Sequence, residues 1–279
     1  MIPPIARRFV AGESAATAIE HARQMNADGV NVILNLLGEH YDDRADADAD
    51  ATAYVGLIQD ISRTGIDACV SVKPSQLGLD LGADVFEENF RRIVEAGDEH
   101  DVFVWCDMED ATTTDTTLDA FETLATEYEW QVGLCLQSNL KRTAADLHRV
   151  GKLPGKIRMT KGAYDEGPRI SYTDKSVVDE RYREDLEYLF VTRDRGIAVG
   201  SHDPAMIDYA KQLADEHGGE FEIQMLMGVR EDAQRELAAD GYEVWQYAPY
   251  GNRWMSYFYR RVRERKENVL FALRAVAGR

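Results

Sequence analysis

Eight short runs rich in β-branched and aromatic residues recur along the chain, and each is followed by a segment with helical periodicity. The runs lie at 30–36, 67–74, 102–108, 130–137, 156–162, 197–203, 221–228 and 243–251. Most are apolar at consecutive positions, which is typical of parallel strands covered on both faces. This alternation predicts a closed eight-stranded β/α barrel of the TIM type, with one further helix at 14–26 before the first strand.

The segments between the runs place their apolar residues on one helical face. Tyr54, Leu57 and Ile61 are one example, and a final helix is expected over 253–276. Asp203 directly before Pro204 marks a helix start. An open doubly wound sheet is the alternative fold, but it would need a glycine-rich turn after the first strand, where the sequence reads LNLLGEHYDD. No linker divides the chain, so we expect a single domain over 1–279.

Acidic residues dominate the charge of the chain. Fifty acids face 32 bases, and the net charge of -18 argues against a nucleic-acid binder, which needs clustered basic residues. An acid-coated, lysine-poor surface suits a cytoplasm of high salt, where charge repulsion is screened, so we predict a halophilic host. The run DDRADADAD at 42–50 lacks the glycine and distal glutamate of a calcium loop and is predicted to be a solvated loop.

Three cysteines, Cys69, Cys106 and Cys135, lie within apolar runs and are predicted to be buried, reduced thiols. The amino-terminal residues have no apolar stretch of the kind that directs secretion. No apolar run approaches the length of a membrane span. A cytoplasmic location is therefore expected.

Polar residues gather where the predicted strands end. The active sites of β/α barrels lie at the carboxyl ends of the strands, so these positions are the first candidates. They are Lys73, Asp107, Gln137, Arg158, Lys161, Ser201, His202, Asp203, Gln224 and Tyr247. Taken singly, each could serve an ion pair, a helix cap or a loop hydrogen bond. Their convergence on one face of the barrel favours a functional site.

The segment 245–267 is unusual because two adjacent arginines, Arg260 and Arg261, follow a cluster of aromatic residues. A surface helix with Arg260 and Glu264 paired one turn apart would account for the charges. An arginine pair facing the barrel mouth would instead suit a small carboxylate, held by forked hydrogen bonds.

With these residues in view, the chain resembles the proline dehydrogenases, specifically the monofunctional prokaryotic type. The matching segments occur in family order and cover nearly the whole predicted barrel. They are SVKPSQLG (71–78), WCDMED (105–110), LQSN (136–139), IRMTKGAYDEG (157–167), GSHD (200–203), FEIQMLMG (221–228) and YAPYG followed by RR and E (247–264).

The resemblance implies FAD-dependent oxidation of L-proline to Δ1-pyrroline-5-carboxylate, by hydride transfer from proline C5 to flavin N5. It implies catalytic roles for Asp107 and Arg158. The residues it implies in FAD binding are Met108, Gln137, Arg158, Lys161, Gly162, Ala163, Ser201 and His202. Those it implies around the substrate are Lys73, Tyr164, Leu226, Tyr247, Arg260, Arg261 and Glu264. It also implies that electrons pass to a quinone or another acceptor, with transient peripheral contact at the inner face of the membrane.

Three other functions use the same strand-end residues. A class I aldolase would form a Schiff base on Lys73 or Lys161. A metal hydrolase would use Asp107, His202 and Asp203, although a single histidine is few for a zinc site, and we predict no metal. A flavin-binding protein without enzymatic activity would bind the cofactor without being reduced by proline.

Overall fold

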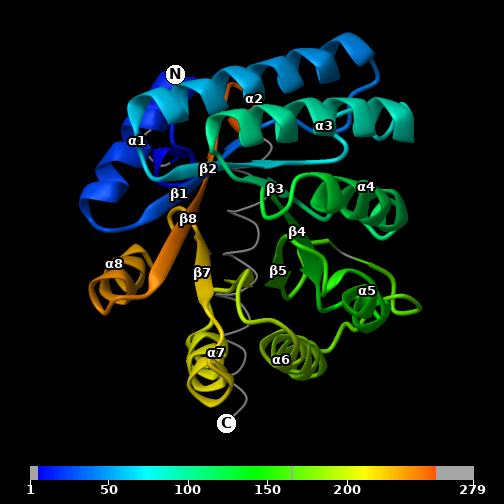
Figure 1. Cartoon of the computed structure of the whole chain (residues 1–279), viewed down its shortest axis with the longest axis vertical. Helices are drawn as coiled ribbons and strands as arrows, with labels where there is room; N and C mark the ends of the chain where they lie inside the picture. The colour runs from blue at the N-terminus through cyan, green and yellow to red at the C-terminus, as the bar shows by residue number, and fades with distance from the viewer. Residues whose placement is uncertain (1–5, 165, 256–279) are drawn as a thin grey trace, which may run out of the picture.

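The computed structural model describes residues 6–164 and 166–255, and its strands form the predicted closed barrel. All neighbouring strands pair in parallel, and β8 closes the sheet against β1, with Ile33 opposite Tyr247. Figure 1 shows the strands enclosed by a layer of helices. The strands are β1 (Asn31–Leu36), β2 (Ala68–Val72), β3 (Val104–Cys106), β4 (Val132–Gln137), β5 (Lys156–Thr160), β6 (Ile197–Gly200), β7 (Phe221–Leu226) and β8 (Glu243–Tyr250).

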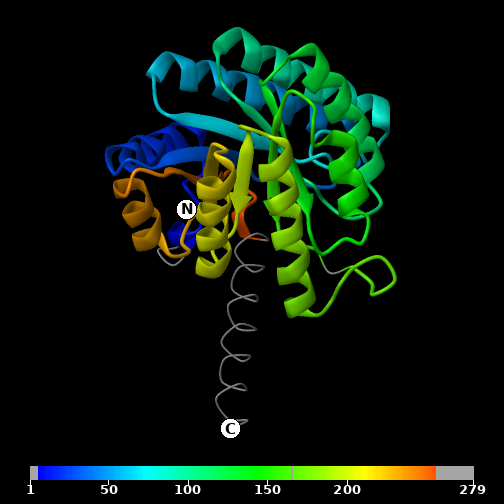
Figure 2. The same cartoon turned by 60° about the horizontal axis from the view of Figure 1, so that its bottom comes forward.

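One α-helix precedes the first strand, as predicted, and the other α-helices connect successive strands within the described residues. In Figures 1 and 2 they form the outer layer of the molecule, with α2 and α3 side by side. A short 3₁₀ helix (Ala6–Arg8) comes first. The α-helices are α1 (Ala15–Ala27), α2 (Arg44–Thr64), α3 (Ala83–His100), α4 (Thr114–Glu127), α5 (Thr143–Val150), α6 (Lys175–Thr192), α7 (Pro204–His217) and α8 (Glu231–Ala239).

Two of the buried hydrophobic clusters define the two sides of the sheet. The larger one lies between the sheet and the helices and contains the predicted helical faces, among them Tyr54 and Phe86, which are fully buried. The smaller one lies inside the barrel, where Ile33, Trp105 and Ala198 pack together. The three cysteines are buried and free of disulfides, as predicted. This arrangement leaves the carboxyl ends of the strands for polar side chains.

The prediction of a solvated loop at 42–50 was wrong, because α2 begins at Arg44. The Asp43 carboxylate accepts a hydrogen bond from the Ala45 amide and caps the helix. Ala47 and Ala51 are buried on one face of the same segment, while most of its acids are exposed. The run is the acidic first part of an amphipathic helix. Its buried residues are alanines, which are too small to give a clear hydrophobic periodicity in the sequence.

Several strands are shorter than predicted. β3 ends at Cys106 and β6 at Gly200, so Asp107, Ser201 and His202 follow their strands directly. The helix start at Asp203 is confirmed, since its carboxylate accepts from the Ala205 amide with Pro204 in the first turn. The predicted helix over 253–276, with Arg260, Arg261 and Glu264, falls almost entirely outside the described residues. Among the helices that are described, none is long and apolar enough to cross a membrane.

Candidate active site at the carboxyl ends of the strands

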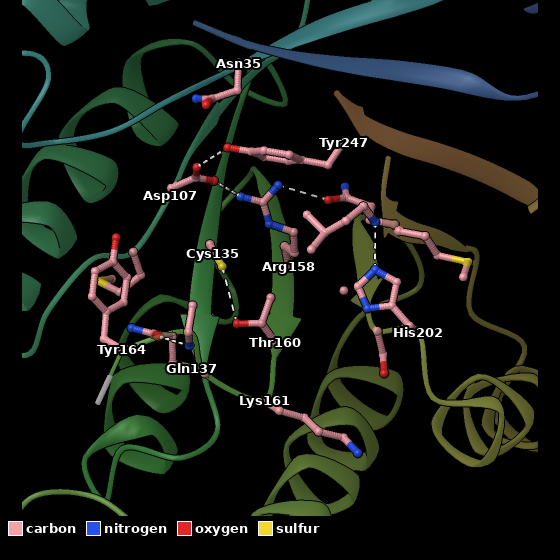
Figure 3. A pocket seen from close by; sticks show the side chains of 18 of the residues that line it. Asn35, Asp107, Cys135, Gln137, Arg158, Thr160, Lys161, Tyr164, His202 and Tyr247 are labelled. Atoms are coloured by element: carbon pink, nitrogen blue, oxygen red, sulfur yellow. Dashed lines mark hydrogen bonds and ion pairs between the residues drawn. The ribbon is translucent and has the colours of Figure 1, made fainter. Parts of the chain in front are cut away.

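A cavity of about 490 Å³ opens at the carboxyl ends of the strands (Figure 3). Its volume falls within the roughly 300–1,000 Å³ of small-molecule and cofactor sites. Every residue that the family resemblance places in the site and that the structure describes lines this cavity, whereas the strand-end candidate Asp203 does not. Those that line it are Lys73, Asp107, Met108, Gln137, Arg158, Lys161, Gly162, Ala163, Tyr164, Ser201, His202, Leu226 and Tyr247. Residues more than 150 positions apart in the chain therefore meet in one place, as the barrel topology requires.

Arg158 of β5 is the most buried cation of the site, with an exposed fraction of 4%. One guanidinium nitrogen forms an ion pair with Asp107, and another donates to Gln224 Oε1 at 3.0 Å. The guanidinium also lies 4.9 Å from the Trp105 ring centre and 5.7 Å from that of Tyr247. These contacts fix a positive charge at the bottom of the cavity in one orientation.

Asp107, directly after β3, connects to residues of β2, β5 and β8 at this point. Besides pairing with Arg158, it accepts from the Tyr247 hydroxyl at 2.6 Å (Figure 3). It also accepts from the Ser71 hydroxyl at 2.8 Å. Burial, reinforced by the adjacent Asp107 charge, raises the pKa of Tyr247 well above its usual value. Tyr247 is therefore a neutral phenol that donates a hydrogen bond to Asp107, and the Asp107 carboxylate holds Tyr247, Ser71 and Arg158 in place.

The two lysines of the site each bind carboxylates. Lys73 Nζ donates to Glu39 at 2.8 Å, and the lysine is only 8% exposed. Lys161 Nζ lies between Asp179, at 2.5 Å, and Asp203, at 2.7 Å. Both amino groups are thus held by carboxylates, whereas a Schiff-base lysine must be placed to attack the carbonyl carbon of a substrate. The geometry thus disfavours the aldolase alternative.

The ends of β4 and β5 are tied together beside the cavity. Gln137 accepts from the Ala163 amide at 2.9 Å through Oε1 and donates to the Glu109 carbonyl at 2.7 Å through Nε2. Gly162 has a φ of +123°, and a Cβ there would lie 2.2 Å from the Asn139 side chain. The positive φ and this close approach favour glycine at this position.

His202 follows β6 and fixes the end of β7. Its Nε2 accepts a hydrogen bond from the Leu226 amide at 2.8 Å (Figure 3). In a neutral imidazole this contact places the proton on Nδ1. Ser201 accepts from the Asp203 amide at 3.1 Å, which shapes the turn into α7. Within the two described ranges, no group of three or more His, Cys, Asp or Glu side chains could hold a metal ion.

Six lining residues were absent from the predicted site: Asn35, Cys135, Thr160, Gly200, Gln224 and Met225. Gln224 had been noted as a strand-end polar residue, and its contact with Arg158 now gives it a role in the site. Cys135 and Thr160 lie two residues from Gln137 and Arg158 on the same strands, so a period of two along β4 and β5 could have found them. Asn35, Gly200 and Met225 lie on other strands. Residue type alone does not distinguish them from core residues.

Comparison with known proteins agrees with this geometry. A family model described as proline dehydrogenase matches residues 18–274. The chain belongs to the proline dehydrogenase family. The proline dehydrogenase of Deinococcus radiodurans is 39% identical over 279 residues, a match that covers 98% of this chain and 90% of that protein. Proline dehydrogenase 2 of Bacillus subtilis is 35% identical over 274 residues and covers 97% of this chain and 90% of its own length.

Solved structures show the same fold. Proline utilization A from Bdellovibrio bacteriovorus superposes with a TM-score of 0.84 at 22% identity, over 92% of this chain and 32% of that one. The chain thus spans about a third of the length of this solved relative. The family predicted from the strand-end motifs is confirmed, and with it the assignment of the chain as an oxidoreductase.

Proposed function

We propose that this chain oxidises L-proline to Δ1-pyrroline-5-carboxylate with FAD as its bound cofactor, the first step of proline catabolism. The observation that carries the proposal is the buried Arg158 guanidinium, held by Asp107 and Gln224 at the bottom of a cavity in a chain of this family. A fixed cation favours a cofactor that gains negative charge on reduction.

The residues around the cavity suit a flavin. Gly162 and Ala163 present small side chains, and a Cβ at Gly200 would lie 2.8 Å from the Met159 carbonyl, so the backbone itself forms part of the wall. We assign Met108, Gln137, Arg158, Lys161, Gly162, Ala163, Ser201 and His202 to cofactor binding. The flavin would supply the two-electron acceptor for the oxidation. The metal hydrolase has less support, because Asp107 and Asp203 are already bound to Arg158 and Lys161.

The substrate would bind as a carboxylate. Lys73 supplies one buried ammonium group for it, which a bound carboxylate would share with Glu39. Arg260 and Arg261 are proposed as its other cations, with Glu264 ordering them. Tyr164, Leu226 and Tyr247 would enclose the ring. Orientation of this kind can lower a barrier by roughly 7–11 kcal/mol, so positioning supplies much of the catalysis.

Oxidation removes a hydride from C5 and a proton from the ring nitrogen. The hydride leaves more readily from the neutral amine than from the ammonium form, so the rate is expected to rise with pH as bound proline deprotonates. Electrons would then pass to a quinone or another acceptor, with transient contact at the inner face of the membrane. That last step rests on the family resemblance alone.

Anaerobic mixing with L-proline tests the proposal. The protein reconstituted with FAD is expected to show the visible absorbance of an oxidised flavin and to lose it when L-proline is added. Failure to take up FAD would refute the proposal. Bound flavin that L-proline leaves oxidised would identify a flavin-binding protein without this activity, and trapping of a carbonyl substrate by borohydride would identify an aldolase.

Substitution of Arg260 tests the assignment of the carboxylate site. Arg260→Met is expected to raise the KM for proline about tenfold or more, because a charge-assisted hydrogen bond is lost, while flavin content stays unchanged. Lys152→Met, an exposed change that removes one positive charge away from the cavity, is the matched control. Loss of flavin with an unchanged KM would show that the roles are misassigned.

A further inference from the structure

A chain of charged and polar side chains runs along the inside of the barrel beneath the cavity. Arg158 donates to Gln224 Oε1, Gln224 Nε2 donates to Glu222 Oε1 at 2.5 Å, and Glu222 forms an ion pair with Lys156. We call these four residues the interior column. They alternate along two strands, with Lys156 and Arg158 on β5 and Glu222 and Gln224 on β7.

Chemistry fixes the direction of every hydrogen bond in the interior column. A guanidinium has only donors and an ionised carboxylate has only acceptors. The Gln224 side chain has an oxygen that accepts and an amide nitrogen that donates. Its oxygen must therefore face Arg158, and its nitrogen must face Glu222. The orientation of the Gln224 amide thus follows from the charges at the two ends of the interior column.

Glu222 can fix the orientation of the Gln224 amide only while its carboxyl group is ionised. Its exposed fraction is 3%, and burial raises its pKa, while the adjacent Lys156 charge opposes that shift. Lys156 is one-quarter exposed at the opposite end of the barrel from the cavity and also lies 5.0 Å from the Phe103 ring centre. A buried carboxylate is retained where a cation and hydrogen bonds compensate it, and both are present here.

We infer that Glu222 and Lys156 are positioning residues for the proposed oxidation, acting through Gln224 to hold the Arg158 guanidinium beneath the cofactor. This inference rests on the proposed function. Neither residue lines the cavity, so neither touches substrate or flavin. Their effect is to set the polarity of a hydrogen-bond chain that ends on the cation of the site.

An isosteric substitution can invert that polarity. In Glu222→Gln, the Lys156 ammonium group would donate to the oxygen of the new amide. The nitrogen of that amide would then face Gln224. Gln224 would then turn its oxygen towards residue 222 and its amide nitrogen towards Arg158. Two hydrogen-bond donors, the amide nitrogen and the guanidinium, would then face each other. The guanidinium would lose an acceptor and be displaced from its fixed orientation, although the shape of the core is unchanged.

The reduction potential of the bound flavin gives the decisive measurement. Displacement of Arg158 in Glu222→Gln removes stabilisation of the reduced flavin and is expected to make the potential more negative. Loss of the Glu222 charge acting only through space would make it more positive. A positive shift, or none, would overturn the inference, because the sign separates positioning from a simple field effect.

Steady-state kinetics and a second substitution complete the test. For Glu222→Gln we expect kcat to fall about tenfold, less than for removal of a direct contact, with little change in the KM for proline. Adding Lys156→Met removes the donor that drives the inversion, so the double variant is expected to recover the wild-type potential and most of kcat. A double variant as impaired as Glu222→Gln would indicate packing damage and contradict the inference.

Two controls make the experiment unambiguous. Glu220→Gln removes an exposed carboxylate just before β7, near the same end of the barrel, and is expected to leave the potential unchanged. If Glu222→Gln does not fold, Gln224→Met removes the acceptor of Arg158 directly and must also shift the potential negatively. Wild-type flavin that proline leaves oxidised would refute the proposed function, whereas a normal wild type with unshifted variants would refute only the interior column.

Discussion

The two sides of the barrel wall are built on different physical principles. Outside the strands, the helices cover the sheet with side chains that are mostly apolar, such as Phe86 and Tyr54. Inside, the strands carry Ser71, Arg158, Glu222 and Gln224, all nearly inaccessible to solvent. Each polar group inside has a partner of opposite character, because an unpaired buried charge costs far more than a paired one. The apolar outer layer therefore contributes most to the stability of the fold. The polar groups inside the barrel are held in fixed orientations that serve the site.

A cavity in the outer layer should have the largest effect. Phe86 is fully buried and stacks on Phe90 with ring centres 5.5 Å apart. Phe86→Ala is expected to lower the free energy of unfolding by about 3–5 kcal/mol, since contacts are lost and a void remains. Urea unfolding measures this, and kcat of the folded fraction should stay close to wild type. A loss of kcat without a loss of stability would contradict the view that the outer layer serves stability and the interior serves catalysis.

Removing the interior cation should affect catalysis more than stability. For Arg158→Met we expect kcat to fall about 10²–10³-fold, comparable to the loss of one preorganised donor to a developing charge. Stopped-flow reduction of the flavin by L-proline measures the loss, and thermal unfolding measures stability. A variant that unfolds but keeps its rate per folded molecule would place Arg158 with the structural residues.

Asp185 of α6 is an exception in the outer layer, because it is a carboxyl with an exposed fraction of 7%. Burial raises its pKa from 3.8 to about 6, against a lowering by Ser138. Between these two values the folded state binds more protons than the unfolded state, so stability falls as pH rises through this window. Above it the ionised carboxyl costs a constant amount.

Asp185→Asn removes that titration. We expect the free energy of unfolding at pH 8 to rise by about 3 kcal/mol, with no gain below pH 4, where the native carboxyl is protonated. Chemical denaturation across this pH range is the measurement. An equal change at both ends of the range would mean that the effect is steric and not electrostatic.

A surface ion pair should matter least. Arg63 binds Asp60 at 2.7 Å, but the Arg63 side chain is 77% exposed. Arg63→Ala is expected to change the free energy of unfolding by less than about 0.5 kcal/mol at moderate salt, because solvent screens the pair. Denaturation at two salt concentrations checks this. The predicted halophilic surface remains a prediction, and unfolding of the wild type against salt concentration would test it.

The order of the elements was readable because each strand and helix carries its own local periodicity. The eight runs and the capped helix start at Asp203 depend on residues near one another in sequence, so pattern alone located them. The acidic start of α2 was missed because alanine, which packs there, has little hydrophobic contrast. Membership of the proline dehydrogenase family was likewise readable, because motifs such as WCDMED and FEIQMLMG lie at the strand ends.

The partners of those residues were decided by tertiary structure. Closure of the barrel brings Asp107, Arg158 and Tyr247 together from three strands, and no local pattern specifies that they bond one another. The same closure places Gln224 and Glu222 under Arg158, which makes an apparent core strand part of the site. Sequence by itself determined where the strands lie and which polar residues stand at their ends; only the three-dimensional packing decided which side chains meet, because hydrogen bonds and ion pairs depend on distances between residues far apart in the chain.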